Sequence, residues 1–129
     1  MDVTRVPIKN LKPGNFVLID GTPCRVEKVS VSVAGKHGAA KARVEAIGLF
    51  DGRRRSIVKP ADEEVDVPIV ERKKAQVLAI LGNNAQLMDL ETYETFELEI
   101  PEERKREVKE GEEIDYYVVV GIRTLQKLR

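Results

Sequence analysis

The chain has 129 residues, of which 42% are hydrophobic and 34% charged, and its 22 basic residues balance its 22 acidic ones. This composition excludes a disordered protein, and no apolar run approaches the ~20 residues that cross a bilayer. Cys24 is the only cysteine, which excludes an intramolecular disulfide. The N-terminal residues lack the apolar segment of a signal peptide, so we expect a cytoplasmic protein that contacts no membrane.

The balanced total hides an uneven distribution of charge. Residues 1–59 contain 12 Lys and Arg against 5 Asp and Glu, whereas residues 60–129 contain 10 against 17. Such a chain either presents its basic half to an anionic partner or uses the two halves to attract each other. The sign changes within Lys59–Val65, which is therefore a candidate boundary, although Asp66–Val70 can still close the first domain.

Short strands separated by turns fill the first half of the chain. Val6–Leu11 has an extended character and Lys12-Pro13-Gly14 is a turn signal. The apolar positions change parity at Glu27-Lys28, which predicts a β-bulge. Strands are predicted over Phe16–Ile19, Cys24–Val33, Lys41–Ala46 and Ser56–Lys59. Together these features predict a small β-barrel.

The segment between the two longest of these strands is the candidate functional element. Gly35 and Gly38 flank Lys36 and permit the backbone to reverse, so the simplest geometry is a long hairpin with Lys36 at its tip. Ala34–Ala40 contains small residues and no apolar anchor, so we expect this loop to be mobile. Most exposed hairpin lysines are merely solvated, and the pattern alone leaves both interpretations open.

The second half predicts another set of strands. Pro101–Lys109 is polar, begins with proline and is followed by Gly111, which predicts a short helix. The strands are predicted over Ala75–Leu81, Gln86–Leu90, Tyr93–Ile100, Ile114–Val120 and Ile122–Leu128. Five strands with a helix between the third and fourth is the order of an oligonucleotide-binding (OB) barrel. We therefore expect an all-β protein with domains at 1–70 and 71–129, joined within Asp66–Lys74.

Catalytic and metal-binding motifs find little support. A phosphate-binding P-loop around Lys36 is rejected because Ser30 and His37 stand where glycine and Ser/Thr are required. His37 is the only histidine and has no evident catalytic partner, and no ligand spacing predicts a metal site. The Asp62-Glu63-Glu64 run is interpreted as a solvated linker. The Arg53-Arg54-Arg55 run predicts either a phosphate contact or a solubilising turn.

Six segments spread over essentially the whole chain form a specific combined pattern. They are Pro23-Cys24-Arg25-Val26, Gly35-Lys36-His37-Gly38, Ala40-Lys41-Ala42-Arg43, Gly48-Leu49-Phe50-Asp51-Gly52, Val67-Pro68-Ile69 and Gln86-Leu87-Met88-Asp89-Leu90-Glu91-Thr92-Tyr93-Glu94-Thr95. In these segments the chain resembles the archaeal translation initiation factor 5A family, which is related to bacterial elongation factor P.

The resemblance implies an N-terminal SH3-like (KOW-type) barrel followed by an OB-fold domain. It also implies that Lys36 is the lysine converted to hypusine or deoxyhypusine, within a modification loop that includes Gly35, His37 and Gly38. Ala39 stands where eukaryotic members usually have a second histidine, and Val33 stands where they usually have lysine. Neither difference affects the Gly-Lys-His-Gly segment.

The resemblance further implies a non-enzymatic translation factor that promotes peptide-bond formation at stalled ribosomes. Its expected partners are ribosomal RNA, peptidyl-tRNA and deoxyhypusine synthase, which transfers an aminobutyl group from spermidine to Lys36. Beyond that covalent modification we expect no cofactor and no metal, and we expect a monomer. The RNA-contact candidates are Lys41, Arg43, Arg53, Arg54 and Arg55. The alternatives are a general single-strand RNA-binding module and a small enzyme that uses His37.

Overall fold

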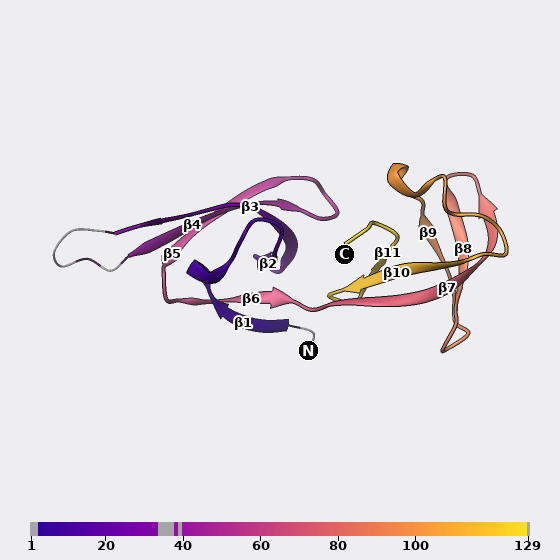
Figure 1. Ribbon diagram of the computed structural model, residues 1–129, viewed down its shortest axis with the longest axis horizontal. Coiled ribbons are helices and arrows are strands. Elements are labelled where there is room, and N and C mark those ends of the chain that lie inside the picture. Colours follow the sequence, from indigo (N-terminus) through magenta and orange to yellow (C-terminus); the bar gives the residue numbers. More distant parts are fainter. Residues whose placement is uncertain (1–2, 34–37, 39, 129) are drawn as a thin grey trace. The chain divides into compact units, whose positions relative to one another are not determined.

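The computed structural model describes residues 3–33, 38 and 40–128, and Figure 1 shows the order of the elements. The chain divides into two compact units, Met1–Ile69 and Val70–Arg129, here called the N-terminal and C-terminal units. Strands dominate both units, and the helical structure of the described residues is confined to two three-residue 3-10 helices. The predicted all-β class is therefore confirmed. The described part of the chain contains no helix that could span a membrane.

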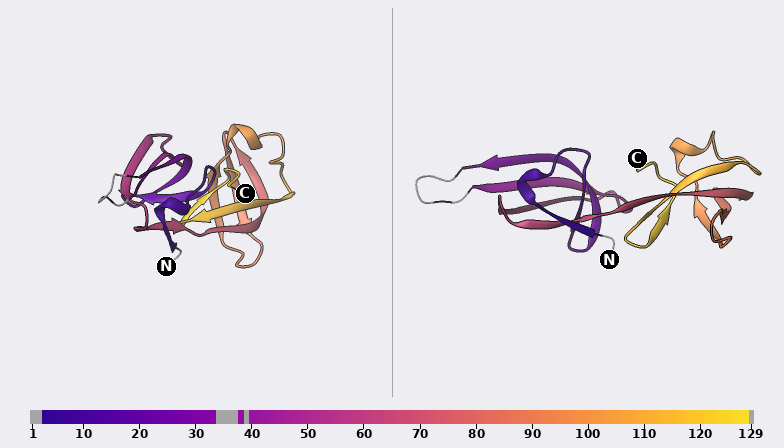
Figure 2. Two further views of the ribbon diagram at one scale, coloured as in Figure 1. Left: turned by 60° about the vertical axis from the view of Figure 1, so that its left-hand side comes forward. Right: turned by 60° about the horizontal axis from the view of Figure 1, so that its bottom comes forward.

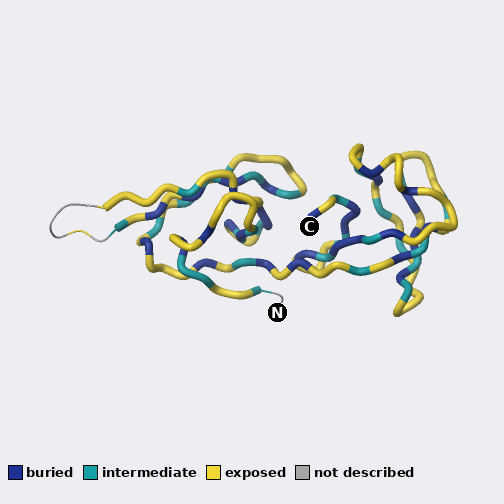
Figure 3. Tube along the Cα trace, viewed as in Figure 1, coloured by how far each residue is buried: buried dark blue, intermediate teal, exposed yellow. Residues whose placement is uncertain are grey.

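A four-stranded antiparallel sheet forms the body of the N-terminal unit. Its strands follow chain order, as β2 (Phe16–Ile19), β3 (Thr22–Ser32), β4 (Lys41–Gly48) and β5 (Arg54–Pro60). A two-stranded ribbon pairs β1 (Val3–Pro7) with β6 (Glu64–Pro68), and η1 (Ile8–Asn10) follows β1. Buried and exposed residues alternate along β4, as the strand period requires (Figure 3). The buried side supplies Ala42, Val44 and Ala46 to an aliphatic core with Ile8, Val17, Val26 and Val65.

Strand β3 contains the bulge that the parity change predicts. Its register with β4 shifts between Val26 and Lys28, which confirms the prediction. On its other side, next to β2, the backbone N–H of Val26 donates to the carbonyl oxygen of Asn15 at 2.8 Å. Beyond the bulge, the pairing of β3 with β4 continues to Ser32 and Lys41, and Figure 2 shows these strands extending together from the rest of the unit.

The acidic run after β5 belongs to the N-terminal unit. Lys9 Nζ lies 2.5 Å from Asp62, Lys59 Nζ lies 2.9 Å from Glu63, and Arg5 Nε lies 3.3 Å from Asp66. The interpretation of this run as a solvated linker is wrong, because it forms the β5–β6 turn and part of β6. The candidate boundary at Lys59–Val65 is wrong for the same reason, since the chain divides after Ile69.

Including the acidic run reduces the difference in charge between the units. The N-terminal unit has 12 basic and 9 acidic residues, and the C-terminal unit has 10 basic and 13 acidic residues. Much of the apparent excess of positive charge in the first half is therefore balanced by carboxylates inside the same unit. Long-range attraction between oppositely charged halves is correspondingly weaker than the sequence predicts.

The C-terminal unit is a five-stranded antiparallel sheet with strand order β11-β10-β7-β8-β9. The strands are β7 (Val70–Leu81), β8 (Asn84–Asp89), β9 (Thr95–Glu99), β10 (Glu113–Val119) and β11 (Ile122–Thr124). The second 3-10 helix, η2 (Glu102–Arg104), lies between the third and fourth of these strands, as the predicted OB order requires. A core that includes Ala75, Leu87, Tyr116 and Leu125 fills the unit, with Phe96 packed against it.

The predicted helix at Pro101–Lys109 is much shorter in the structure. Only Glu102–Arg104 is helical, as a 3-10 turn, and further turns follow. Arg104 accounts for the difference, because this residue is only 4% exposed and its side chain is bound inside the unit. Its guanidinium donates to the backbone oxygens of Asp115 at 2.5 Å and Leu125 at 3.1 Å, and it also pairs with Glu107. These bonds tie the turn to β10 and to the C-terminal segment.

Candidate functional site

The hairpin formed by β3 and β4 is the element that positions the candidate segment. The last pair of its ladder joins Ser32 and Lys41, so residues 33–40 connect the two strands. Strand β5 pairs with β4 as far as Lys41 and Pro60, so three strands support the base of this connection. The predicted modification site, Lys36, lies outside the described residues, as do Gly35 and His37. The predicted mobility of Ala34–Ala40 therefore stays a prediction.

Five cations occupy the outer face of this sheet, which is the side of β3, β4 and β5 that points away from the core. The strand register places on this face Arg25 and Lys28 of β3, Lys41 and Arg43 of β4, and Arg54 of β5. We call this set the basic face. All five side chains are exposed, and Glu45 is the one acidic residue paired into the same rows.

The cations of the basic face differ in the ion pairs and aromatic contacts that they make. Arg54 forms a 2.8 Å ion pair with Glu27, and the Arg25 guanidinium lies 5.3 Å from the centre of the Phe16 ring. Arg43 is only 4.0 Å from Glu45, a weak exposed contact. Lys28 and Lys41 make no ion pair with any residue in the described ranges. Two of the predicted RNA contacts, Lys41 and Arg43, are thus available on this face next to the connection.

Arg53 and Arg55 lie in different surroundings from Arg54. The backbone N–H of Arg53 donates to Asp51 at 2.9 Å, and its exposed side chain forms no ion pair with the rest of the described chain. Arg55 pairs across the sheet with the buried Ala46, on the core side, and donates two hydrogen bonds to the Asp51 carboxylate at 3.1 and 2.7 Å. The three consecutive arginines therefore form no single cationic surface.

The Asp51–Arg55 pair closes over Gly48. A Cβ at Gly48 would lie 2.1 Å from Asp51 Oδ1 and 2.7 Å from Arg55 Nη1, so any other residue here would displace the pair. The Arg55 hydrogen bonds hold the pKa of Asp51 well below its usual range, and Asp51 raises the pKa of Arg55 in turn. Burial raises the pKa of the Cys24 thiol despite the nearby guanidinium. Cys24 is consequently an unreactive core residue.

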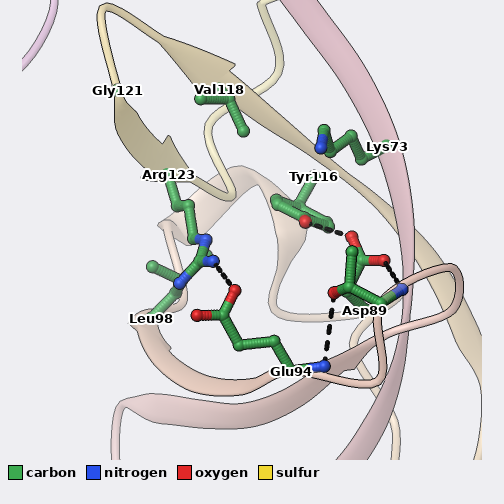
Figure 4. Close-up of a pocket in the computed structure, with 9 residues that line it drawn as sticks. Lys73, Asp89, Glu94, Leu98, Tyr116, Val118, Gly121 and Arg123 are labelled. Carbon is green, nitrogen blue, oxygen red and sulfur yellow. Dashed lines mark hydrogen bonds and ion pairs between the residues drawn. The ribbon is translucent and has the colours of Figure 1, made fainter.

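The C-terminal unit contains a cavity of about 370 Å³ beside the turn that joins β8 to β9 (Figure 4). Asp89, only 3% exposed, accepts a hydrogen bond from the Tyr116 hydroxyl inside this cavity. The other carboxylate oxygen of Asp89 accepts the backbone N–H groups of Glu91 at 2.7 Å and Thr92 at 2.9 Å. These bonds, led by that from Tyr116, lower the pKa of Asp89 to about 2. Burial is the main reason that the pKa of Tyr116 is raised.

Arg123 forms the opposite wall of the same cavity. Its guanidinium pairs with Glu94 and lies 4.2 Å from the centre of the Phe96 ring, so it bridges β11 to β9. Each carboxylate in the cavity is already bound to a protein donor, and no buried polar side-chain atom of the described residues lacks a hydrogen-bond partner. The carboxylates of the cavity therefore serve structural bonds, and the Lys73 amine in its lining is only 4.0 Å from Glu71, a weak contact.

Sequence reasoning missed Asp89, Tyr116 and Arg104 as individual residues. A weak signal exists for Asp89, because aspartate at the end of a strand often binds the backbone two residues further on. No comparable signal marks Arg104, which stands among other charged residues of the same polar run. Its backbone partners are 11 and 21 residues away.

Comparison with known proteins places both units in one family. Residues 3–63 match the family model described as translation initiation factor 5A-like, N-terminal, and residues 69–124 match that described as eukaryotic elongation factor 5A hypusine, DNA-binding OB fold. Translation initiation factor 5A of Archaeoglobus fulgidus is 52% identical over 124 residues, covering 96% of this chain and 97% of that protein. The Methanocella arvoryzae protein of the same name is 59% identical over 114 residues, covering 88% of this chain and 89% of the relative.

Solved structures agree with these sequence relationships. Eukaryotic translation initiation factor 5A from Methanococcus jannaschii superposes with a TM-score of 0.85 at 47% identity, over 95% of this chain and 91% of that one. A translation initiation factor eif-5a family protein from Naegleria fowleri superposes with a TM-score of 0.73 at 28% identity, over 96% of both chains. The two-domain fold expected from the resemblance is thereby confirmed, and the chain belongs to the translation initiation factor 5A family.

Proposed function

We propose that this translation factor binds the ribosome and promotes peptide-bond formation at stalled sites through a hypusine or deoxyhypusine side chain on Lys36. The observation that carries the proposal is the β3–β4 ladder. Its last pair, Ser32 with Lys41, brackets the connection that contains Lys36, while exposed cations follow the outer face of the same strands. The paired strands would bring the connection that contains Lys36 to the end of the hairpin, where a partner could reach it.

The proposed modification suits contact with RNA. Deoxyhypusine synthase would transfer the 4-aminobutyl group of spermidine to the Lys36 amine, where a carbon–nitrogen bond forms as one in spermidine breaks. The displaced 1,3-diaminopropane takes up the proton that Lys36 loses, so the overall exchange requires no net oxidant. The product is a longer side chain with two cationic nitrogens, which can bind phosphate without reading the base sequence.

The basic face would supply the sequence-independent part of ribosome binding. Lys41 and Arg43 are exposed at the end of β4 nearest the connection, where they can contact phosphates of ribosomal RNA or of peptidyl-tRNA. The modified side chain would then orient the acceptor end of the tRNA. Peptide-bond formation would remain the chemistry of the ribosome, and this protein would accelerate it by positioning, as a non-enzymatic factor.

A general single-strand RNA-binding role for the C-terminal unit has less support. Such modules stack bases on aromatic side chains that lie in a positively charged groove. In this unit Tyr116 and Tyr117 are buried and Arg123 covers the Phe96 ring, so among the described residues the exposed Tyr93 is the aromatic side chain left for stacking. The unit also has more acidic than basic residues.

The Lys36→Arg variant tests the proposal, because it keeps a positive charge but removes the primary amine that the synthase alkylates. We expect the variant to fold normally, gain no mass after incubation with synthase and spermidine, and keep weak ribosome binding. In a reconstituted translation system it should fail to restore synthesis through consecutive prolines. Full restoration by Lys36→Arg would contradict the proposal.

The matched control is Lys41→Arg, in which a nearby lysine on the ladder changes in the same way. This control should still be modified at Lys36 and should restore synthesis as well as modified wild-type protein does. Unmodified wild-type protein should behave like Lys36→Arg, since both lack the added amine.

A further inference from the structure

The turn after β5 holds one end of the connection that contains Lys36. This connection returns to the sheet through Ala40, whose backbone oxygen accepts a hydrogen bond from the backbone N–H of Ala61 at 2.9 Å. Ala61 directly follows β5, and the last pair of the β4–β5 ladder is Lys41 with Pro60. The bond therefore extends the pairing of β4 and β5 by one residue toward Lys36.

The two arms of the connection are held by different partners. On the β3 arm the pairing ends at Ser32, and Val33 makes no backbone hydrogen bond to another described residue. On the return arm Ala40 is bound to the turn after β5. Lys36 lies four residues after Ser32 and four residues before Ala40. These two residues are therefore the nearest described points at which the backbone around Lys36 is hydrogen-bonded.

Ala61 is itself fixed to the interior of the N-terminal unit. It is 5% exposed, and its backbone oxygen accepts the N–H of Lys9 at 3.2 Å. The preceding N–H, that of the fully buried Ile8, donates to the backbone oxygen of Glu63 at 2.8 Å. Helix η1 thus connects the core to the turn after β5, and the turn connects η1 to the return arm.

The N–H of Ala61 is not required by its own turn. The turn is closed by the N–H of Glu63, which donates to the backbone oxygen of Pro60 at 2.9 Å. Neither Ala61 nor Asp62 has a positive φ, which excludes turns of types II, I′ and II′. In the remaining common type, type I, the second residue donates no hydrogen bond within the turn. Ala61 is this second residue, and its N–H instead binds Ala40.

We propose that Ala61 is a positioning residue for Lys36, because its bond to Ala40 sets where the modified side chain meets the acceptor end of peptidyl-tRNA. The inference rests on the proposed function and names the residue that would determine this geometry. Ala61 is buried, so it acts through the connection and makes no contact with RNA itself. Acceleration by positioning depends on accurate placement, and a displacement of about 1 Å can cost about 100-fold in rate.

The variant Ala61→Pro tests the inference, because proline is favoured at the second position of a type I turn but has no N–H to donate. The matched control is Glu102→Pro. Glu102 also follows a proline and has the same position in the turn that the N–H of Arg104 closes on Pro101, and its own N–H donates to no described backbone oxygen.

Each protein is first fully modified on Lys36, as its intact mass shows. The rate of peptide-bond formation at consecutive prolines is then measured in a reconstituted system as a function of factor concentration. We expect Ala61→Pro to lower the maximal rate about fivefold and to keep the half-saturating concentration within about twofold of wild type, since the basic face is unchanged. Glu102→Pro should match wild type in both quantities.

An unchanged maximal rate in Ala61→Pro would overturn the inference. A higher half-saturating concentration with an unchanged maximal rate would also overturn it, because the bond would then support binding and not placement. If urea unfolding shows that Ala61→Pro is not folded under the assay conditions, a second variant replaces it. Ala61→lactic acid, which has an ester in place of the Pro60–Ala61 amide, removes the N–H and keeps the methyl side chain. The same fivefold loss is expected of it, and a wild-type maximal rate would overturn the inference.

Failure of the proposed function would give a different result. If modified wild-type protein is no faster than unmodified wild-type protein, the role of the Lys36 modification is contradicted and the positioning role with it. If modified wild-type protein is faster and modified Ala61→Pro is equally fast, only the positioning role is contradicted.

Discussion

The Tyr116 hydroxyl donates a hydrogen bond to the carboxylate of Asp89 in the interior of the C-terminal unit. This bond connects β10 to the end of β8, and Asp89 binds the backbone of the following turn at the same time. One buried carboxylate thus fixes both the packing of an aromatic residue and the conformation of a loop. The arrangement depends on Asp89 remaining ionised.

We predict that Asp89 makes the stability of the protein sensitive to acid. The pKa of Asp89 is lowered from 3.8 to about 2, so ionised Asp89 stabilises the fold fully above about pH 5. This contribution is lost as the pH falls from about 5 to about 2. The shift corresponds to a contribution on the order of 2 kcal/mol at neutral pH. Urea unfolding of wild type and Asp89→Asn should show a gap that narrows between about pH 5 and pH 2. Glu91→Gln is the control, and a gap independent of pH would contradict the prediction.

Arg104→Lys should destabilise the C-terminal unit although the charge is conserved. A single ammonium group cannot reproduce the bonds that the guanidinium makes to Asp115, Leu125 and Glu107 from a site that is 4% exposed. We expect a loss of about 3 kcal/mol in the free energy of unfolding. Arg106→Lys, at an exposed position two residues away, should change it by less than about 0.5 kcal/mol. Equal effects of the two substitutions would show that the buried bonds contribute little.

Gly48→Ala should destabilise the N-terminal unit through the Asp51–Arg55 pair. The added methyl group would overlap Asp51 Oδ1, at 2.1 Å, and we expect a loss of about 2 kcal/mol. In an Asp51→Ala background the same change should cost clearly less, because the obstructing carboxylate is absent. A double-mutant cycle measured by chemical denaturation would report this coupling. If the effects of Gly48→Ala and Asp51→Ala on the free energy of unfolding are additive, the added methyl group does not clash with the Asp51 carboxylate.

Neutralising the cations next to the connection should weaken ribosome binding and reduce its dependence on salt. If Lys41 and Arg43 each contact a phosphate, the variant Lys41→Gln/Arg43→Gln should make the negative slope of log K against log salt shallower by about 1.5. Arg55→Gln should leave the slope unchanged, since Arg55 is bound to Asp51 and lies on the core side. Binding measured by sedimentation with ribosomes between about 50 and 200 mM salt would distinguish the two. An unchanged slope in the double variant would show that Lys41 and Arg43 contact no phosphate.

Features of the fold that depend on local alternation could be predicted from the sequence. The succession of strands along the C-terminal unit and the bulge at Glu27-Lys28 follow from the spacing of apolar residues and from the parity at which they recur. The length of the helical segment after Pro101 could not be predicted, because Arg104 is drawn inward by backbone oxygens from distant strands. Composition alone does not distinguish this arginine from its exposed neighbours.

The same limit applies to the charged runs that the sequence displays most clearly. Asp62-Glu63-Glu64 has the composition of a linker, but each carboxylate meets a cation from another part of the N-terminal unit. Arg53, Arg54 and Arg55 form one run in the sequence and have three different environments in the structure. Alternation along a strand separates neighbouring side chains, so a run of like residues need not form a patch.

The bulge in β3 determines where one residue can be inserted or deleted without exchanging the two sides of the hairpin. Because side chains alternate strictly after the bulge, removing or adding one residue between Lys28 and Ser32 would turn the serines toward the core and the valines toward the cations, whereas removing the extra residue Glu27 would only restore a regular ladder. Homologous chains should therefore keep a constant residue count across this interval, even where the identities of the residues differ. An alignment gap there would mark a protein whose hairpin has lost its division into a charged side and an apolar side.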